Sequence, residues 1–139
     1  MVSPLIHYNM ATKNTINLLF DDTFTFTLLE DDNITPVSLS SIADVIILFK
    51  VNEQEVLKFK STIATGYKQW TQDITNDHKL HCKVERAETT LFPEGELKAE
   101  LVIVENDTDF QDNLKYNSPI ELELGYIRNT QLKGVINDN

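Results

Sequence analysis

The chain is poor in cysteine, glycine, proline and basic residues, and it has no long apolar run. Its single cysteine, Cys82, excludes an internal disulfide. Four glycines are too few and too scattered to form a loop that cradles a phosphate group. No apolar run approaches the roughly 20 residues that cross a bilayer, and residues 1–10 lack the basic and apolar regions of a secretory signal. We therefore expect a protein that makes no membrane contact and works where it is made.

Asp and Glu outnumber Lys and Arg by 22 to 12, so the 139-residue chain carries a net charge of −10. This charge repels the phosphates of nucleic acids, and we expect no nucleic-acid partner. An acidic surface keeps a protein soluble and also suits a basic partner. The hydrophobic fraction of 41% is typical of a globular chain, and the length allows one domain with a substantial core.

Apolar residues alternate with polar ones in a pattern that predicts strands. In Thr23–Leu29, apolar residues alternate with threonines. Ala43–Lys50 is apolar on both faces, as in a central strand covered on two sides. After a turn at Pro93–Gly95, the segment Glu96–Val104 places Leu101 and three other small or aliphatic residues on one face. This last strand is expected to organise the fold.

The rest of the chain predicts further short strands and the turns between them. The expected strands are Thr15–Phe20, Val56–Phe59, Tyr67–Ile74, Leu80–Val84, Pro119–Ile127 with Ile120, Leu122, Leu124 and Tyr126 on one face, and Leu132–Ile136 at an edge. A single helical turn is expected at Arg86–Leu91 and a loop at Glu105–Asn117. Seven to nine short strands without a long helix predict an all-β, antiparallel β-sandwich over residues 15–136. Residues 1–14 are expected to form a short arm and residues 137–139 a tail.

The sequence offers no convincing catalytic, cofactor or metal site, and we expect none of the three. His78, His81 and Cys82 are close in sequence, but on a strand His81 points away from the other two. Zinc needs three or four convergent ligands, and the chain has one other histidine. Cys82 alternates with apolar residues, which indicates a small buried side chain. The acidic clusters 31–33 and 106–109 hold oxygen ligands that suit calcium, but such clusters also form ordinary turns.

Two groups of residues are candidates for an interface. The apolar residues of the arm are Leu5, Ile6, Tyr8 and Met10. Added as a strand to the exposed edge of a second copy, the arm would produce a homo-oligomer; alternatively, it folds back on its own domain. The second group consists of the aromatic residues Tyr67, Trp70, Phe110 and Tyr116. They suit a sugar-binding platform or the centre of a protein interface, unless Trp70 instead closes one end of the sandwich.

Several segments taken together resemble a known family. They are Asp22–Leu28, Val37–Leu39 ahead of Ala43–Val45 and Phe49–Lys50, Leu80–Val84, and the glycine corner and strand of Leu91–Leu101. In this order the chain from Asp22 to Ile127 resembles the immunoglobulin-like N-terminal domain of phage baseplate upper proteins and related virion modules. It departs from that pattern in the long polar stretch Ser61–Lys79 and in its few turn glycines.

The resemblance implies an immunoglobulin-like sandwich and a non-enzymatic structural protein of a phage particle, in its baseplate, neck or capsid. Such a protein acts through contacts with copies of itself and with other virion proteins, and it is assembled in the cytoplasm of the host bacterium. No catalytic residue comes with the family. The alternatives are a carbohydrate-binding β-sandwich that uses the surface aromatics, and a small enzyme with an unrecognised site.

Overall fold

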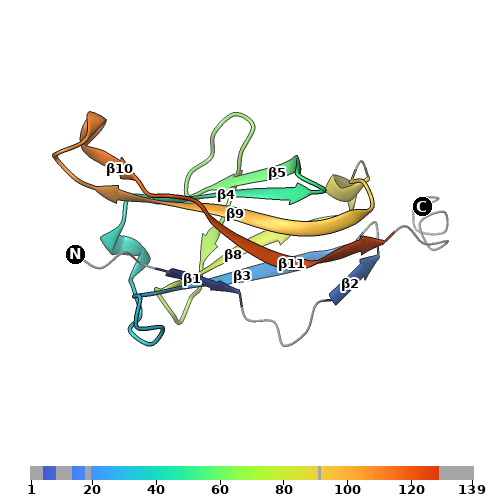
Figure 1. Cartoon of the computed structure of the whole chain (residues 1–139), viewed down its shortest axis with the longest axis horizontal. Coiled ribbons are helices and arrows are strands. Elements are labelled where there is room, and N and C mark those ends of the chain that lie inside the picture. The colour runs from blue at the N-terminus through green and yellow to red at the C-terminus, as the bar shows by residue number, and fades with distance from the viewer. Residues whose placement is uncertain (1–4, 9–13, 18–19, 91, 129–139) are drawn as a thin grey trace.

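The structure is a computed structural model that describes residues 5–8, 14–17, 20–90 and 92–128. Within these residues the strands form two sheets that pack face to face as a β-sandwich (Figure 1). The described part of the chain has short 3-10 turns in place of α-helices: η1 (Leu39–Ser41), η2 (Arg86–Thr89) and η3 (Gln111–Asn113). The expected all-β sandwich is therefore confirmed.

The smaller sheet has four strands in the order β1 (Leu5–Tyr8), β3 (Asp22–Leu29), β8 (Lys79–Val84) and β7 (Thr71–Gln72), all antiparallel. The larger sheet runs β2 (Asn14–Asn17), β11 (Ile120–Arg128), β9 (Gly95–Asn106), β4 (Asp44–Val51), β5 (Gln54–Lys60) and β6 (Lys68–Gln69), and β10 (Leu114–Tyr116) pairs with the far end of β9. The expected organising strand is β9, which has β4 on one side and β11 on the other.

The two sheets meet around Phe49, a fully buried residue of β4. The centre of its ring lies 5.3 Å from that of Phe24 and 6.4 Å from that of Phe26, both on β3 of the opposite sheet. Phe59 on β5 lies 5.4 Å away within the same sheet. Tilted and edge-on ring contacts of this kind add to the free energy gained by burying apolar surface. These four rings thus join the sheets and determine which face of each strand points inward.

The turn before β9 requires a glycine, as the sequence indicates. Gly95 has a φ of +145°, and a Cβ at this position would overlap the side-chain amide of Asn52. That amide bridges the turn, because its nitrogen donates to the carbonyl of Glu94 at 2.6 Å and its oxygen accepts from the backbone of Glu96 at 3.3 Å. The close approach links the β4–β5 turn to the start of β9.

Part of the segment expected to be an arm belongs to the sandwich. The strand β1 pairs with β3 of the same chain, from Leu5 opposite Leu29 to Tyr8 opposite Phe26. An exposed β3 edge would leave backbone groups unpaired, and this segment satisfies them. The sandwich therefore extends to Leu5 rather than beginning at residue 15, and the strand expected at Thr15–Phe20 is β2, Asn14–Asn17. Met10 and the expected segments 132–136 and 137–139 lie outside the described residues.

The segment Tyr67–Ile74, expected as one strand, forms two very short strands in different sheets. β6 pairs with β5 in the larger sheet, and β7 pairs with β8 in the smaller one. Trp70 lies between them and is buried, and its Nε1 donates to the carbonyl of Val45 at 2.8 Å. The indole therefore fills the space between the sheets, so the interpretation of Trp70 as a surface interface residue is wrong.

A bulge in β11 changes the face on which Tyr126 lies. The pairing with β9 shifts between Glu123 and Gly125, which places Leu124 and Ile127 in the core and leaves Tyr126 half-exposed. An extra residue in one strand reverses the alternation beyond it. The expected single face of Ile120, Leu122, Leu124 and Tyr126 therefore ends at the bulge.

The burial of β9 predicts different costs for two adjacent substitutions. Leu101 is fully buried, whereas Glu100 faces outward and pairs with Lys50 at 3.2 Å. Leu101→Ala should lower the free energy of unfolding by about 2–5 kcal/mol through lost burial and the cavity left behind. Glu100→Ala should cost less than half as much, since partly exposed ion pairs contribute little. Urea unfolding of both variants measures the difference, and equal losses would contradict the assigned face.

Candidate functional site

One end of the sandwich, on the left of Figure 1, collects several of its loops. The strand register places them there, because Thr27 pairs with Lys79 at the end of β3, and Asp44 pairs with Val104 near the end of β9. We call this region the loop end. It comprises the β3–β4 loop (30–43), the β7–β8 loop (73–78) and the β9–β10 loop (107–113), together with the β5–β6 loop (61–67), which begins beside Asp44 and projects from the upper edge of the larger sheet in Figure 1.

Hydrogen bonds connect the loops to one another and to the sheets. Ser38 Oγ of the β3–β4 loop donates to Asp77 Oδ2 of the β7–β8 loop at 2.9 Å, and the Leu39 amide donates to the Asp77 carbonyl at 2.8 Å. The Ser61 amide, at the start of the β5–β6 loop, donates to Asp44 Oδ1 at 3.0 Å. These bonds join the β3–β4 loop to the β7–β8 loop and fix the start of the β5–β6 loop to β4.

Each of the four loops exposes a large apolar side chain. Ile34 is 79% exposed, Ile63 is 84% exposed and Ile74 is fully exposed, while Phe110 is 49% exposed. Single exposed apolar residues are common on protein surfaces. Four of them on four different loops at one end are a more specific arrangement, and sequence analysis anticipated only Phe110.

Aspartate side chains hold three of these apolar residues in defined turns. Asp32 Oδ1 accepts from the amides of Ile34 and Thr35, both at 2.8 Å. In the β7–β8 loop, Asp73 Oδ2 accepts from the amides of Thr75 and Asn76, the two residues after Ile74, at 3.1 and 2.8 Å. Asp107 Oδ1 accepts from the Asp109 amide at 3.0 Å, just before Phe110. Such side-chain-to-backbone bonds stabilise turns and restrict their motion.

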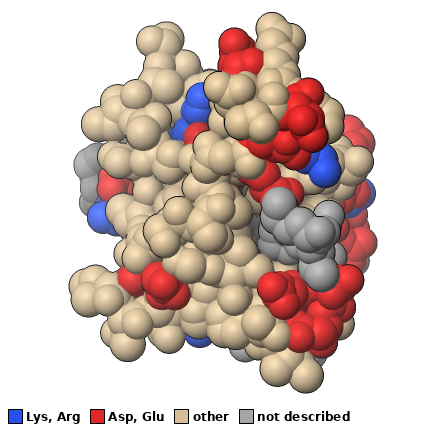
Figure 2. All heavy atoms as spheres, turned by 90° about the vertical axis from the view of Figure 1, so that its left-hand side faces the viewer, with Lys and Arg blue, Asp and Glu red and all other residues tan. Residues whose placement is uncertain are grey.

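The loop end is acidic. Three carboxylates lie in the β3–β4 loop, two in the β7–β8 loop and three in the β9–β10 loop, and none of the chain's 12 Lys and Arg falls within the four loops. Figure 2 looks onto this end and shows carboxylates grouped around neutral surface, with Lys and Arg only in small patches. The hydrogen bond from the Thr35 side chain, with those from the turn amides, lowers the pKa of Asp32, so this carboxyl stays ionised.

The residues expected at an interface do not come together as one group. Phe110 and Tyr116 are exposed on the same β9–β10 hairpin. Tyr67 is half-buried, with the Lys58 and Lys60 ammonium groups 4.6 and 5.1 Å from its ring centre. Leu5, Ile6 and Tyr8 belong to β1, and Trp70 is in the core.

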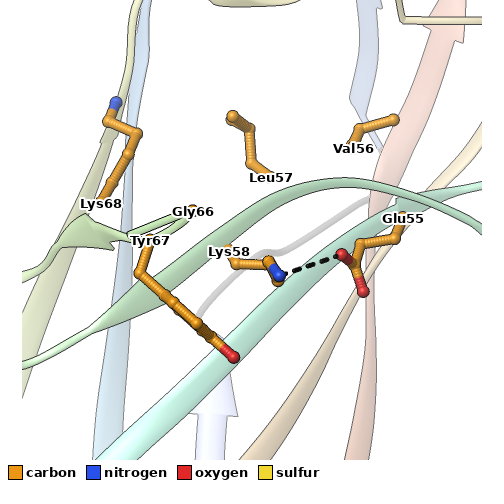
Figure 3. Close-up of a pocket in the computed structure, with 7 residues that line it drawn as sticks. All are labelled: Glu55, Val56, Leu57, Lys58, Gly66, Tyr67 and Lys68. Atoms are coloured by element: carbon orange, nitrogen blue, oxygen red, sulfur yellow. Dashed lines mark ion pairs between the residues drawn. The ribbon is translucent and has the colours of Figure 1, made fainter. Parts of the chain in front are cut away.

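A hollow of about 260 Å³ lies beside Tyr67, lined by residues 55–58 and 66–68 (Figure 3). Lys58 points along the Tyr67 ring toward Glu55, 3.6 Å away, whereas Lys68 and Leu57 point to the other side. Lys68 is engaged by Glu88. A small-molecule site requires polar groups that converge on one point. The polar groups of this hollow do not converge in that way.

Three side chains on the outer face of the smaller sheet form a hydrogen-bonded chain that sequence analysis missed. His81 Nε2 lies 2.7 Å from Asp73 Oδ1, and its Nδ1 lies 2.7 Å from Thr25 Oγ1. A carboxylate only accepts hydrogen bonds, so Nε2 carries a hydrogen. None of these residues lines the hollow beside Tyr67. The chain ties the β7–β8 turn to the sheet, and the pairing of Thr25 with His81 in neighbouring strands is the signal that would have revealed it.

Cys82 and the remaining ionisable clusters take structural positions. Cys82 is fully buried, as expected, and burial raises the pKa of its thiol. Within the described residues no three His, Cys, Asp or Glu side chains are grouped to hold a metal ion. On the outer face of the larger sheet, Lys50 and Lys98 each contact three carboxylates at 3.2–3.3 Å, including those of Glu53 and Glu121. The hydrogen bond with Glu121 is the main cause of the raised pKa of Lys50.

The hydrogen bond from His81 predicts a pH-dependent role for Asp73. It lowers the pKa of Asp73 from 3.8 to about 2, so the ionised carboxylate stabilises the fold above pH 3.8, and this contribution is lost between pH 3.8 and about 2. Asp73→Asn should therefore destabilise the protein near neutral pH and have little effect near pH 2. Urea unfolding at both pH values measures this, with Asp31→Asn as the control. A loss of equal size at both pH values would contradict it.

Function is inferred from the geometry of the structure, because comparisons with known proteins found no match. Among the described residues, no helix has the length and apolar character needed to cross a membrane. No protein-family model, curated protein or solved structure matches this chain.

Proposed function

We propose that this chain is a non-enzymatic structural protein of a phage particle that acts through protein–protein contacts. The observation that carries the proposal is the loop end, where four loops each expose a large apolar side chain. Exposed apolar groups collected on one surface characterise binding sites for other proteins. The phage setting comes from the resemblance of the sequence to baseplate upper proteins. Its partners are then copies of itself and other virion proteins, met during assembly in the bacterial cytoplasm.

The strand order supports an immunoglobulin-like form of the sandwich. In the variable type of that fold, one sheet has the order A-B-E-D and the other G-F-C-C′-C″. Here the corresponding strands are β1-β3-β8-β7 and β11-β9-β4-β5-β6, in the same chain order. The parallel pairing of β6 with β5 is a departure from the antiparallel sheets of that fold. We propose the immunoglobulin-like assignment on this order.

The test is the presence of the chain in purified particles. Phage particles are produced in cells that carry the gene for the chain and are purified on a density gradient. The proteins of the purified particles are quantified by mass spectrometry. We expect the chain at a fixed copy number relative to the major capsid protein, and particles from a deletion strain to be incomplete or unstable. Normal particles without the chain would contradict a structural role.

A carbohydrate-binding function is the second candidate, because Phe110 and Tyr116 are both exposed on one hairpin. Aromatic faces of this kind can stack on sugar rings. The buried position of Trp70 removes the largest member of the proposed platform. A glycan array would show selective binding that Phe110→Ala and Tyr116→Ala abolish; an empty array would exclude this function for the glycans tested.

A further inference from the structure

We infer that the loop end docks on a second protein whose contact surface combines apolar pockets with basic side chains. This inference rests on the proposed function, that the chain acts through protein contacts, and it names the surface and the kind of partner.

The apolar side chains are concentrated at this end. Among the described residues, six large hydrophobic side chains are exposed, and five of them lie on the four loops or on β10 beside them: Ile34, Ile63, Ile74, Phe110 and Tyr116. The sixth, Tyr126, pairs with Glu96 near the opposite end of the sandwich. A random scatter over the surface would not favour one end. Burial of these side chains in pockets of a partner would provide the main gain in affinity.

The side chains are presented on turns that are already ordered. Asp32 accepts hydrogen bonds from the amides of Ile34 and the residue after it, and Asp73 accepts them from the amides of the two residues after Ile74. His81 holds Asp73 from the sheet below at 2.7 Å. A loop that is ordered before binding loses less conformational entropy on binding, which raises affinity and specificity. The ordered turns therefore suit recognition of a defined partner better than nonspecific association.

The charge of the four loops disfavours docking on a second copy of the same surface and favours a basic partner. The four loops hold eight carboxylates and no Lys or Arg, and the nearby β10 adds one lysine, Lys115, 5.8 Å from the centre of the Phe110 ring. Two copies docked through this end would bring like charges together, which disfavours association. A partner with Lys or Arg around its pockets would instead be attracted, and the attraction would weaken as salt is added.

The experiment selects partners from random short peptides displayed on phage, against the full chain immobilised through its C-terminus. The most enriched peptide is then synthesised, and its affinity is measured by isothermal titration calorimetry at about 0.05 M and about 0.5 M NaCl. The double variant Ile34→Ser/Ile74→Ser removes two apolar side chains that would contact the peptide. Both side chains are so exposed that they contribute little to the stability of the fold. Asp31→Asn/Asp109→Asn removes charge from two exposed residues of the same surface, and Tyr126→Ser is the control near the opposite end.

We expect enriched peptides that place large apolar residues beside Lys or Arg. The isoleucine variant should weaken binding by at least about tenfold, and the aspartate variant by about threefold at low salt, with a smaller salt dependence. Tyr126→Ser should bind as the unchanged protein does. Unenriched or acidic peptides, binding insensitive to the isoleucine variant, or a dimer that this variant dissociates in sedimentation would each overturn the inference. Absence of the chain from virions would refute the proposed setting and leave these results standing.

Discussion

The contact of Phe49 with Phe24 and Phe26 is the constraint on which the rest of the structure depends. It joins the central strand of the larger sheet to β3 of the smaller one and fixes the inward face of both. Side chains alternate along a strand. The inward faces of β3 and β4 therefore determine which residues of the neighbouring strands β8 and β9 are buried. The same registers align the ends of the strands, so the loops between them are gathered at one end of the sandwich.

The distribution of charge follows from where the lysines lie. Lys50 and Lys98 are held by carboxylates on the outer face of the larger sheet, and Lys58 and Lys68 pair with Glu55 and Glu88 nearby. These four lysines are therefore engaged along the strands or beside them, whereas the four loops carry carboxylates and no Lys or Arg. These carboxylates do two things at once: some cap the turns, and all of them keep a surface with exposed apolar groups soluble.

The sequence predicted the fold best where a strand has one clear apolar face. The strands β3, β4 and β9 were expected within one or two residues of their observed bounds. It failed where tertiary contacts overrode the local pattern. Trp70 lies between strands of different sheets, and its polar neighbours give no local sign of burial. In β11, Gly125 inside a strand was the available signal for the bulge that turns Tyr126 outward.

The loop end could not be found from the sequence because its residues are far apart along the chain. Ile34 and Ile74 each look like an isolated apolar residue within a polar turn, and nothing local relates one to the other. Only the strand order brings them together, through the bonds of Ser38 and Leu39 to Asp77. A local signal does exist in each turn, since a large apolar residue within two positions of a capping aspartate gains nothing for the turn itself. Such a residue is better explained by something outside the chain that covers it.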